Sequence, residues 1–373
     1  MVSGENIDQV FLQPAYWCPH PGLLPHTGEG EDTLARCRDR WARECGESKP
    51  QAYHACVGAN ERRSMSFFDI LLQQIINGLA LGMMYALLAL GFTMVYGIIE
   101  LINFAHFSVF MTGTFIGLAV LNLLGFTGSS AALSVLPLVG TLLLVFAVTM
   151  LATGLLGTLI ERLCLRPMRG VAGTAPMITT IGVAFILVNL VLMVWGPQTQ
   201  PFPGIIPDQR WAIGQAEVTL KQLLLGVAGL LLMLVLQYLV RRTALGKAMR
   251  ATAQDVDAAQ MMGVDVDRII MLTFFLGSAL AGAGSLFFGF YYGFTGFYIG
   301  YTTGLRAFTS AVLGGIGNIP GAVLGGLLIG LIQSLGGQLL QVRWTDVIIF
   351  SILIGLLVFR PTGLFGVQTP QKA

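Results

Sequence analysis

The sequence predicts an all-α polytopic membrane protein with about eight apolar segments, two of them broken helices. Its 373 residues are 55% hydrophobic and only 11% charged, and the mean hydropathy is +0.75, whereas soluble domains carry about a quarter charged residues. Charged side chains are missing from long stretches, since Glu100 is the only one between Asp69 and Glu161. Helices of about 20 apolar residues span a bilayer. These stretches lack the ~10-residue alternating pattern of a transmembrane barrel, so we predict helices.

Residues 1–64 differ from the rest of the chain, because they are polar and contain no long apolar run. They hold four of the five cysteines and three of the four histidines. The potential metal ligands among them are Cys18, His20, His26, Cys37, Cys45, His54 and Cys56. Their spacing repeats no zinc pattern such as paired Cys-x-x-Cys, so we predict neither a metal site nor a cofactor. We expect this segment to be disordered or to precede the true start at Met65, which leaves 65–373 as the membrane domain.

The apolar segments lie near residues 68–92, 93–125, 131–160, 174–196, 219–240, 269–292, 305–336 and 346–360. The second and the seventh are too long or too interrupted for a single plain helix. In the seventh, Gly314–Gly321 combines four glycines with Pro320, and both residue types weaken a helix. Two interpretations stay open: a broken helix that lines a substrate cavity, as in transporters, or a short loop between two half-length helices.

The orientation of the segments follows from basic residues in their connections. Three arginines lie at 162–169, and five lysines and arginines lie at 241–268. Cytoplasmic loops carry an excess of such residues, so both connections are predicted to face the cytoplasm, with two spans between them. The connection at 196–217, which holds four prolines, then lies outside. The side of each terminus stays open.

Small residues crowd the sixth and seventh segments. Gly321 with Gly325, and Gly326 with Gly330, follow a small-xxx-small spacing. Glycine lets helix backbones approach closely in lipid. We therefore expect these positions to pack against neighbouring helices.

Three polar residues in an apolar setting are candidates for a substrate pathway. Glu100, Asn103 and His106 are spaced by three, which places them along one side if the stretch is helical. Ionisable groups inside a bilayer usually face a cavity or a partner. For Glu100 a cavity and the interfacial water are equally open, whereas Asn103 and His106 favour a cavity or a helix break.

The connection at 241–268 is the second candidate region. Good helix formers from Leu245 to Met262 predict one or two short helices outside the membrane, and Gly263 suits a left-handed helix end. The flexible side chains of Met261 and Met262 could dock a soluble partner. An ordinary amphipathic loop is the alternative.

The sequence contains no recognisable catalytic motif, so we predict that the chain is not an enzyme. It has no G-x-x-x-x-G-K-[ST] phosphate loop, no H-E-x-x-H zinc motif and no G-x-S-x-G nucleophile turn. A net charge of +2 is too mild to indicate a nucleic-acid partner.

Four sequence stretches stand out: Tyr96–Ile99, Ile102–His106, Ala307–Gly321 and Arg360–Gly366. They resemble motifs of branched-chain amino-acid ABC transporter permeases of the Liv-H type. The resemblance implies a transmembrane permease subunit of an ATP-driven importer for branched-chain amino acids or a related small solute, in the inner membrane of a bacterial-type cell. It also implies a second homologous permease, two cytoplasmic ATPase subunits and an extracytoplasmic substrate-binding protein as partners. Whether the permease pair is a homodimer or a heterodimer stays open.

The resemblance completes two sets of candidate residues. The substrate-pathway candidates are Glu100, Asn103, His106, Gly314, Gly315, Asn318 and Pro320. The ATPase-coupling candidates are Arg250, Asp257, Ala258, Ala259, Met261, Met262 and Gly263, because the 241–268 loop is similar to the coupling loop of importer permeases. Phe107 departs from the family, which usually has glycine there, and we expect its ring to narrow or reshape the pathway. The alternative function is an ion-coupled secondary carrier that uses Glu100 and His106 as a proton relay.

Overall fold

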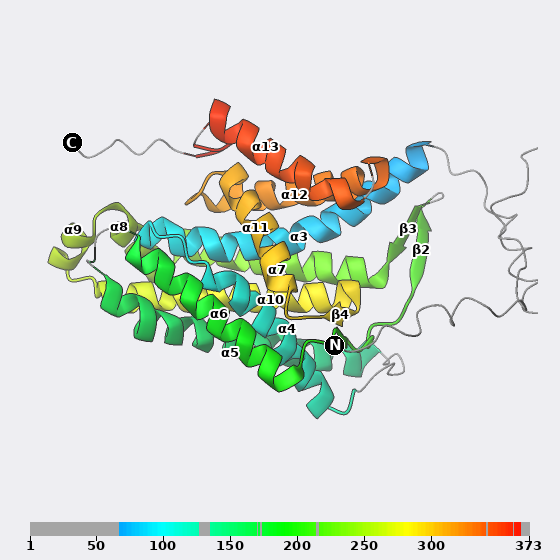
Figure 1. Cartoon of the computed structure of the whole chain (residues 1–373), viewed down its shortest axis with the longest axis horizontal. Coiled ribbons are helices and arrows are strands. Elements are labelled where there is room, and N and C mark those ends of the chain that lie inside the picture. Colours follow the sequence, from blue (N-terminus) through cyan, green and yellow to red (C-terminus); the bar gives the residue numbers. More distant parts are fainter. Residues whose placement is uncertain are drawn as a thin grey trace, which may run out of the picture. The chain divides into compact units, whose positions relative to one another are not determined.

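The computed structural model describes residues 67–126, 135–169, 171, 174–213, 216–340, 342–360 and 362–366. Among these residues, eight helices are long and apolar enough to cross a membrane, which confirms the predicted all-α polytopic fold (Figure 1). They contain α3 (Phe67–Ile99), α4 (Ala105–Leu123), α5 (Val135–Ile160), α6 (Ala175–Trp195), α7 (Leu220–Arg242), α10 (Val266–Tyr292), α12 (Ile319–Leu340) and α13 (Thr345–Phe359). The span of α5 runs from Pro137 to Met168, and that of α13 begins at Val342. The predictions made for 1–64 lie outside the described residues.

Short elements connect these helices. The helical ones are η2 (Glu161–Leu165), η3 (Arg166–Met168), α8 (Ala244–Gln254), α9 (Val256–Met261), α11 (Ile299–Gly314) and η4 (Val342–Trp344). The strands are β1 (Gln200–Pro201), β2 (Arg210–Ile213), β3 (Ala216–Thr219) and β4 (Phe294–Thr295). β2 and β3 form an antiparallel hairpin, and β1 pairs antiparallel with β4, which joins the connection before α7 to the end of α10.

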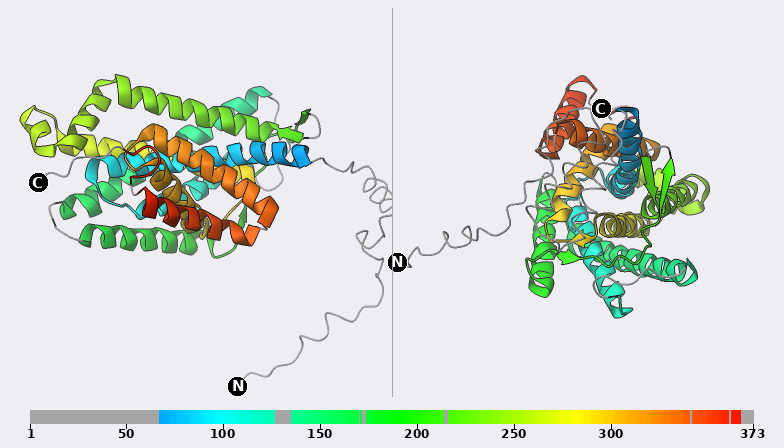
Figure 2. Two further views of the ribbon diagram at one scale, coloured as in Figure 1. Left: turned by 90° about the horizontal axis from the view of Figure 1, so that it is seen from above. Right: turned by 90° about the vertical axis from the view of Figure 1, so that its right-hand side faces the viewer.

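Helices α3 and α10 form the centre of the bundle, and other helices cover them. In its most apolar window α10 is 78% buried, whereas α6 and α13 are each only 17% buried. In the end-on view of Figure 2 the red α13 lies at the edge of the bundle. Exposed apolar side chains on the outer helices include Leu143, Phe185 and Phe359, which suits contact with lipid tails rather than water.

The boundary predicted between the first and second segments, at residue 92, is wrong. Helix α3 continues to Ile99, and the break falls at residues 100–104 inside the predicted second segment. Two local features produce it. Glu100 has a φ of 54°, the only positive φ of a non-glycine residue in the part of the chain that the structure describes. The Oδ1 atom of Asn103 accepts a hydrogen bond from the backbone N–H of Ala105 at 3.1 Å, which supports the start of α4.

The seventh segment matches neither of its two interpretations fully. A turn at 315–318 separates the 16-residue α11 from the 22-residue α12, so only the first helix is short. The segment also begins earlier than predicted, at Ile299 instead of 305. At Gly315 the chain adopts a φ of 100°, and a Cβ there would lie 2.5 Å from the backbone nitrogen of Gly366. Only glycine fits that position.

The two basic connections meet at one end of the bundle, as predicted. Arg166 and Arg169 both form ion pairs with Asp267 at the start of α10. We call this the basic end, and the cytoplasmic orientation expected for it stays a prediction. The opposite end carries the β2–β3 hairpin, and we call it the hairpin end. There Gln73 near the start of α3 accepts a hydrogen bond from the backbone N–H of Glu217 at 2.7 Å. Helix α3 therefore starts at the hairpin end, and α13 runs from the hairpin end to the basic end.

Glycines of α12 face two different neighbours, which confirms that small-residue spacing serves packing. A Cβ at Gly325 would lie 2.1 Å from the backbone oxygen of Ser310 in α11. A Cβ at Gly326 would lie 2.5 Å from the Cα atom of Ala86 in α3. Helix α12 is thus wedged between α3 and α11 with almost no space on either side.

Candidate functional site

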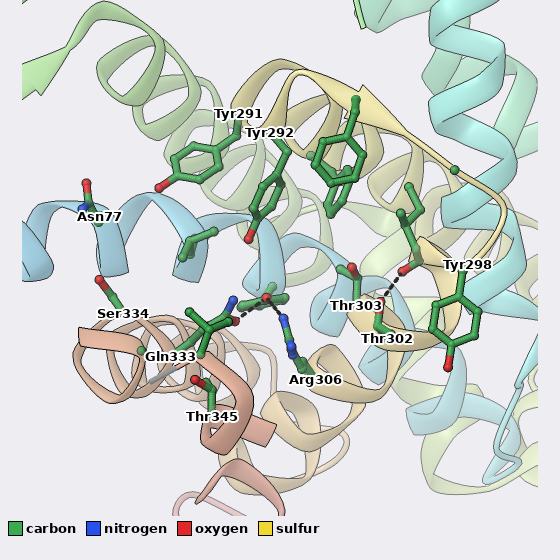
Figure 3. Close-up of a pocket in the computed structure, with 18 of the residues that line it drawn as sticks. Asn77, Tyr291, Tyr292, Tyr298, Thr302, Thr303, Arg306, Gln333, Ser334 and Thr345 are labelled. Atoms are coloured by element: carbon green, nitrogen blue, oxygen red, sulfur yellow. Dashed lines mark hydrogen bonds between the residues drawn. The ribbon is translucent and has the colours of Figure 1, made fainter. Parts of the chain in front are cut away.

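A cavity of about 680 Å³ lies at the hairpin end of the bundle (Figure 3). Side chains of α3, α10, α11 and α12 form its walls, and Thr345 at the start of α13 closes one side. Its volume falls in the range of pockets that hold small molecules, roughly 300–1,000 Å³. The cavity can therefore accommodate a small solute between the central helices.

A network of hydrogen bonds between polar side chains lies in the wall of this cavity. The Nε atom of Arg306 donates to Oδ1 of Asp346 at 2.7 Å, and its Nη1 atom donates to the Tyr85 hydroxyl at 3.4 Å. The same hydroxyl donates to Oε1 of Gln333 at 2.5 Å. Figure 3 shows Arg306 and Gln333 pointing toward one another across that hydroxyl. Four helices, α3, α11, α12 and α13, contribute one residue each.

Arg306 is the only charged residue among the described residues that line the cavity. It sits halfway along α11, and its side chain is 18% exposed, whereas its partner Asp346 is 48% exposed. A charge in such a place needs a counter-charge or a wet cavity. Arg306 has both, since Asp346 pairs with it and the cavity lies beside it.

Aromatic rings form the wall next to this network. The rings of Phe288 and Tyr292 lie 4.6 Å apart between centroids, and those of Tyr291 and Tyr292 lie 5.1 Å apart. The ring of Tyr292 also lies 5.9 Å from that of Phe294 on β4, between centroids. The cavity thus presents an apolar surface beside a charged one, which suits an amphipathic solute.

An aromatic cluster lies on the basic-end side of Arg306. Phe308, two residues further along α11, meets Phe92 of α3 edge to face at 5.3 Å. Phe92 in turn stacks with Phe107 at 6.1 Å. Phe107 is buried, and a Cβ at Gly304 would lie 2.4 Å from its Cγ atom. The ring fills the crossing of α4 and α11 instead of projecting into the cavity at the hairpin end.

The pathway candidates predicted from the sequence lie away from this cavity. Glu100 and Asn103 fall in the break at the basic end, and Glu100 is exposed there. Asn103 is buried and lines a second cavity, of about 410 Å³, together with Arg169 and Asp267. Since residues 100–104 are not helical, the three candidates do not share one helix face.

His106 is buried in the bundle, whereas Glu100 is exposed. Its side chain is only 1% exposed, and its Nε2 atom has no hydrogen-bond partner among the described residues. A Cβ at Gly91 of α3 would lie 2.9 Å from that atom. The imidazole is therefore packed against α3, while Glu100 points into the solvent layer.

The glycine-rich candidates Gly314, Gly315, Asn318 and Pro320 shape the turn between α11 and α12. The Asn318 side-chain amide donates to the Phe365 carbonyl at 2.7 Å. The backbone N–H of Leu364 donates to the carbonyl of Leu313 at 2.9 Å. Pro320 occupies the first turn of α12, where a missing N–H costs nothing. The C-terminal segment 362–366 thus binds the end of α11.

The coupling candidates lie on two short helices outside the bundle, as the helix-forming residues predicted. Asp255 caps α9 by accepting from the N–H groups of Asp257 and Ala258. Met261 and Met262 end α9 with 83% and 85% of their surface exposed. Gly263 has a φ of 80° and terminates the helix, which confirms the predicted left-handed position.

The remaining candidates hold these short helices in place. Ala259 is buried, whereas Asp257 and Ala258 are exposed. Arg250 donates from its Nη1 atom to the carbonyl of Val240 at the end of α7. A small cavity of about 90 Å³ separates Arg250 from Gly317 and Ile319 of the glycine-rich turn. Helix α8 packs against α3, α7 and α10, and it faces the α11–α12 turn across this cavity.

An ion cluster ties the basic connections together. Glu161 is only 2% exposed and pairs with Arg169, whose other nitrogen contacts Asp267 at 2.6 Å. Arg166 pairs with the second oxygen of Asp267. The cluster links the end of α5 to the helix that follows the α8–α9 loop.

A bundle of membrane helices with a solute-sized cavity at one end and exposed short helices at the other is the architecture of a membrane transport protein. A family model described as the permease component of branched-chain amino acid transport systems matches residues 74–357. The chain belongs to this family. It is a multi-pass transporter permease subunit and not an enzyme, and a permease component implies partner components in the same transport system.

Individual relatives support the assignment. The high-affinity branched-chain amino acid transport system permease protein BraD of Pseudomonas aeruginosa is 40% identical over 306 residues, which cover 81% of this chain and 97% of that relative. The corresponding permease LivH of Salmonella typhimurium is 38% identical over 312 residues, covering 82% and 98%. A probable LivH of Methanocaldococcus jannaschii is 28% identical over 303 residues, covering 76% and 88%. No solved structure matches the chain. These similarities favour the permease over the ion-coupled carrier.

Sequence reasoning missed the residues of the hairpin-end cavity. One signal for Arg306 was present, because it is the only charged residue between Ile269 and Val342. Tyr85 and Gln333 carry no comparable signal, since 248 residues separate them along the chain. Only the packing of α3 against α12 brings them together.

Proposed function

We propose that this chain is the membrane-spanning permease of an ATP-driven importer for branched-chain amino acids or a closely related small solute. Its site would be the inner membrane of a bacterial-type cell. A homologous second permease, two cytoplasmic ATPase subunits and an extracytoplasmic binding protein would complete the transporter. The observation that carries the proposal is the placement of a solute-sized cavity and of the exposed tip of α9 at opposite ends of one bundle.

The cavity supports the proposed cargo class. Branched-chain amino acids combine a short apolar side chain with a charged backbone, and the cavity offers aromatic rings beside the Arg306 network. The binding protein would release cargo at the hairpin end. The Phe92–Phe107–Phe308 cluster lies between Arg306 and the basic end of α11, where an importer waiting for cargo would need a barrier.

The basic end supports coupling to a separate ATPase. Met261 and Met262 project from a loop that is fixed to the bundle by the Arg250 contact to Val240. Force on α9 would pass through α8 to α3 and α10, against which α8 packs, and α3 in turn packs against α11. Because α11 carries both Arg306 and Phe308, a shift of this helix would change the cavity and the aromatic cluster together. Such a device needs two states that ATP and cargo favour differently.

Reconstitution of the purified complex in proteoliposomes tests this proposal. Uptake of labelled leucine, isoleucine or valine should require the binding protein outside and ATP at the ATPase subunits. A proton uncoupler should leave that uptake unchanged. Uptake by this chain alone, driven by a pH gradient without nucleotide, would contradict the proposal and support the ion-coupled carrier.

A further inference from the structure

The hairpin-end cavity contains one group that can select for charge. Arg306 is the only charged residue among the described residues lining it. A guanidinium carries five N–H donors in a planar fork. The described contacts use the Nε donor for Asp346 and one Nη1 donor for Tyr85. The remaining donors belong to a side chain that borders a cavity large enough for a solute.

The counter-ion of Arg306 is more accessible to water than Arg306 itself. Asp346 stands at the first turn of α13 and is 48% exposed, whereas Arg306 is 18% exposed. Water can therefore solvate the carboxylate of Asp346 if the pair opens, but a guanidinium inside the bundle still needs an anion. A carboxylate that enters the cavity satisfies this need, because arginine binds carboxylates in bidentate geometry.

The surroundings of Arg306 distinguish the two ends of an amphipathic solute. The hydroxyl of Tyr85, fixed by Gln333, lies beside the guanidinium and can donate to an oxygen once it turns from its present partner. The aromatic pair Phe288 and Tyr292 lies on α10, on another wall of the same cavity. A ligand with a carboxylate and a short apolar chain has a matching surface for each part.

We propose that Arg306, assisted by Tyr85, binds the carboxylate of the cargo during its passage, and that Asp346 is the counter-ion that holds Arg306 when the site is empty. The cargo class is therefore defined by a free carboxylate next to an apolar group. This proposal rests on the proposed import function, and it adds the group of the cargo that the permease itself recognises.

Direct binding to the complete transporter, in nanodiscs without binding protein and without nucleotide, tests the proposal. Three probes separate the chemistry: leucine, 4-methylpentanoate, which keeps the carboxylate but lacks the ammonium group, and leucinamide, which lacks the carboxylate. Saturation-transfer NMR should detect leucine and 4-methylpentanoate, which compete with one another, and should detect leucinamide only weakly. Equal binding of leucinamide and leucine would overturn the proposal.

Variants connect the carboxylate preference to named residues. Arg306→Gln should weaken leucine binding about tenfold or more, because it removes the charge-assisted hydrogen bonds to the carboxylate. Arg306→Lys should retain part of it, and Tyr85→Phe should lose less than Arg306→Gln. Arg210→Gln is the matched control, because Arg210 lies on β2 at the same end and is paired with Glu217 outside the cavity. Unchanged leucine binding in Arg306→Gln would refute the role of Arg306.

Two further measurements keep the outcome interpretable. Basal ATP hydrolysis and elution of the intact complex show whether a variant has folded and assembled. If Arg306→Gln does not assemble, the comparison of leucine with leucinamide on the unchanged transporter still decides. Normal leucine import together with equal binding of the two probes would refute this inference alone, whereas absence of import of any amino acid would refute the proposed function.

Discussion

The ring of Phe107 packs directly against Gly304, since a Cβ at Gly304 would lie only 2.4 Å from the Cγ atom of Phe107. The two residues come from α4 and α11, and the ring fits because the glycine has no side chain. The bulky side chain of Phe107 is thus matched by a glycine on the opposite helix.

Gly304→Ala should therefore destabilise the protein by about 1–3 kcal/mol through overpacking. Phe107→Ala made in the same chain should restore part of the loss, because the methyl group then occupies space that the ring vacated. Thermal unfolding in detergent measures the double-mutant cycle. Gly226→Ala is the control, since a Cβ at Gly226 meets no atom within 4 Å. Additive effects of the two substitutions would contradict the pairing.

Glu161→Gln should weaken the link between α5 and α10. The carboxylate is buried and pairs with Arg169, which also holds Asp267, so the substitution leaves an arginine without its buried counter-charge. We expect a loss of about 1.5–3 kcal/mol, the range for hydrogen bonds to charged groups. Glu217→Gln is the control, because the pair of Glu217 with Arg210 is exposed and contributes about 1 kcal/mol or less. Equal losses in both variants would show that the cluster has no special role.

Met262→Asp should uncouple ATP hydrolysis from transport. The side chain is 85% exposed, so the folded membrane domain should keep its unfolding temperature while a charge disrupts an apolar docking contact. Leucine uptake per ATP hydrolysed is the measurement. Gln254→Asp adds a charge at another exposed position of the same loop and should have little effect. Normal coupling in Met262→Asp would remove Met262 from the docking surface.

Glu100→Gln should leave uptake unchanged, because the side chain lies in solvent at the basic end and not in the hairpin-end cavity. Glu100→Gly should be tolerated or slightly stabilising, by about 1 kcal/mol or less, since the residue has a φ of 54° and a left-handed conformation costs a non-glycine residue roughly 1–2 kcal/mol. Uptake assays and thermal unfolding measure the two effects. A large loss of uptake in Glu100→Gln would return this carboxylate to the pathway.

The helical fold was predictable because its cause is local. Long charge-free stretches require helices wherever they occur, and basic connections orient them without knowledge of their neighbours. The glycine spacing in α12 likewise predicted close helix packing. It did not predict that Gly325 and Gly326 face different helices. The break was misplaced because residues 100–104 contain no proline or glycine, and it depends on the backbone of Glu100 and the side chain of Asn103.

The cavity was not predictable from the same patterns. Its polar network joins Tyr85, Arg306, Gln333 and Asp346 from four helices, and each of the uncharged members looks like an ordinary residue of an apolar span. The sequence favoured residues near motifs instead, and these turned out to shape turns at the basic end. The glycines of the recognised motifs indicate where the chain turns. The cavity, in contrast, depends on which helices pack against one another.

Helix α11 carries both a residue that lines the hairpin-end cavity and a residue that is held by the C-terminal segment. Arg306 stands at its middle, and Leu313, bound by the backbone of Leu364, stands at its basic end. Sixteen residues at a rise of about 1.5 Å span roughly 24 Å, which is less than the ~30 Å of the hydrocarbon layer. A tilt of this helix about its anchored end displaces the guanidinium sideways without breaking any backbone hydrogen bond of the helix. If the proposed function holds, cargo occupancy and the state of the ATPase subunits would influence each other mechanically, through the angle of one short helix.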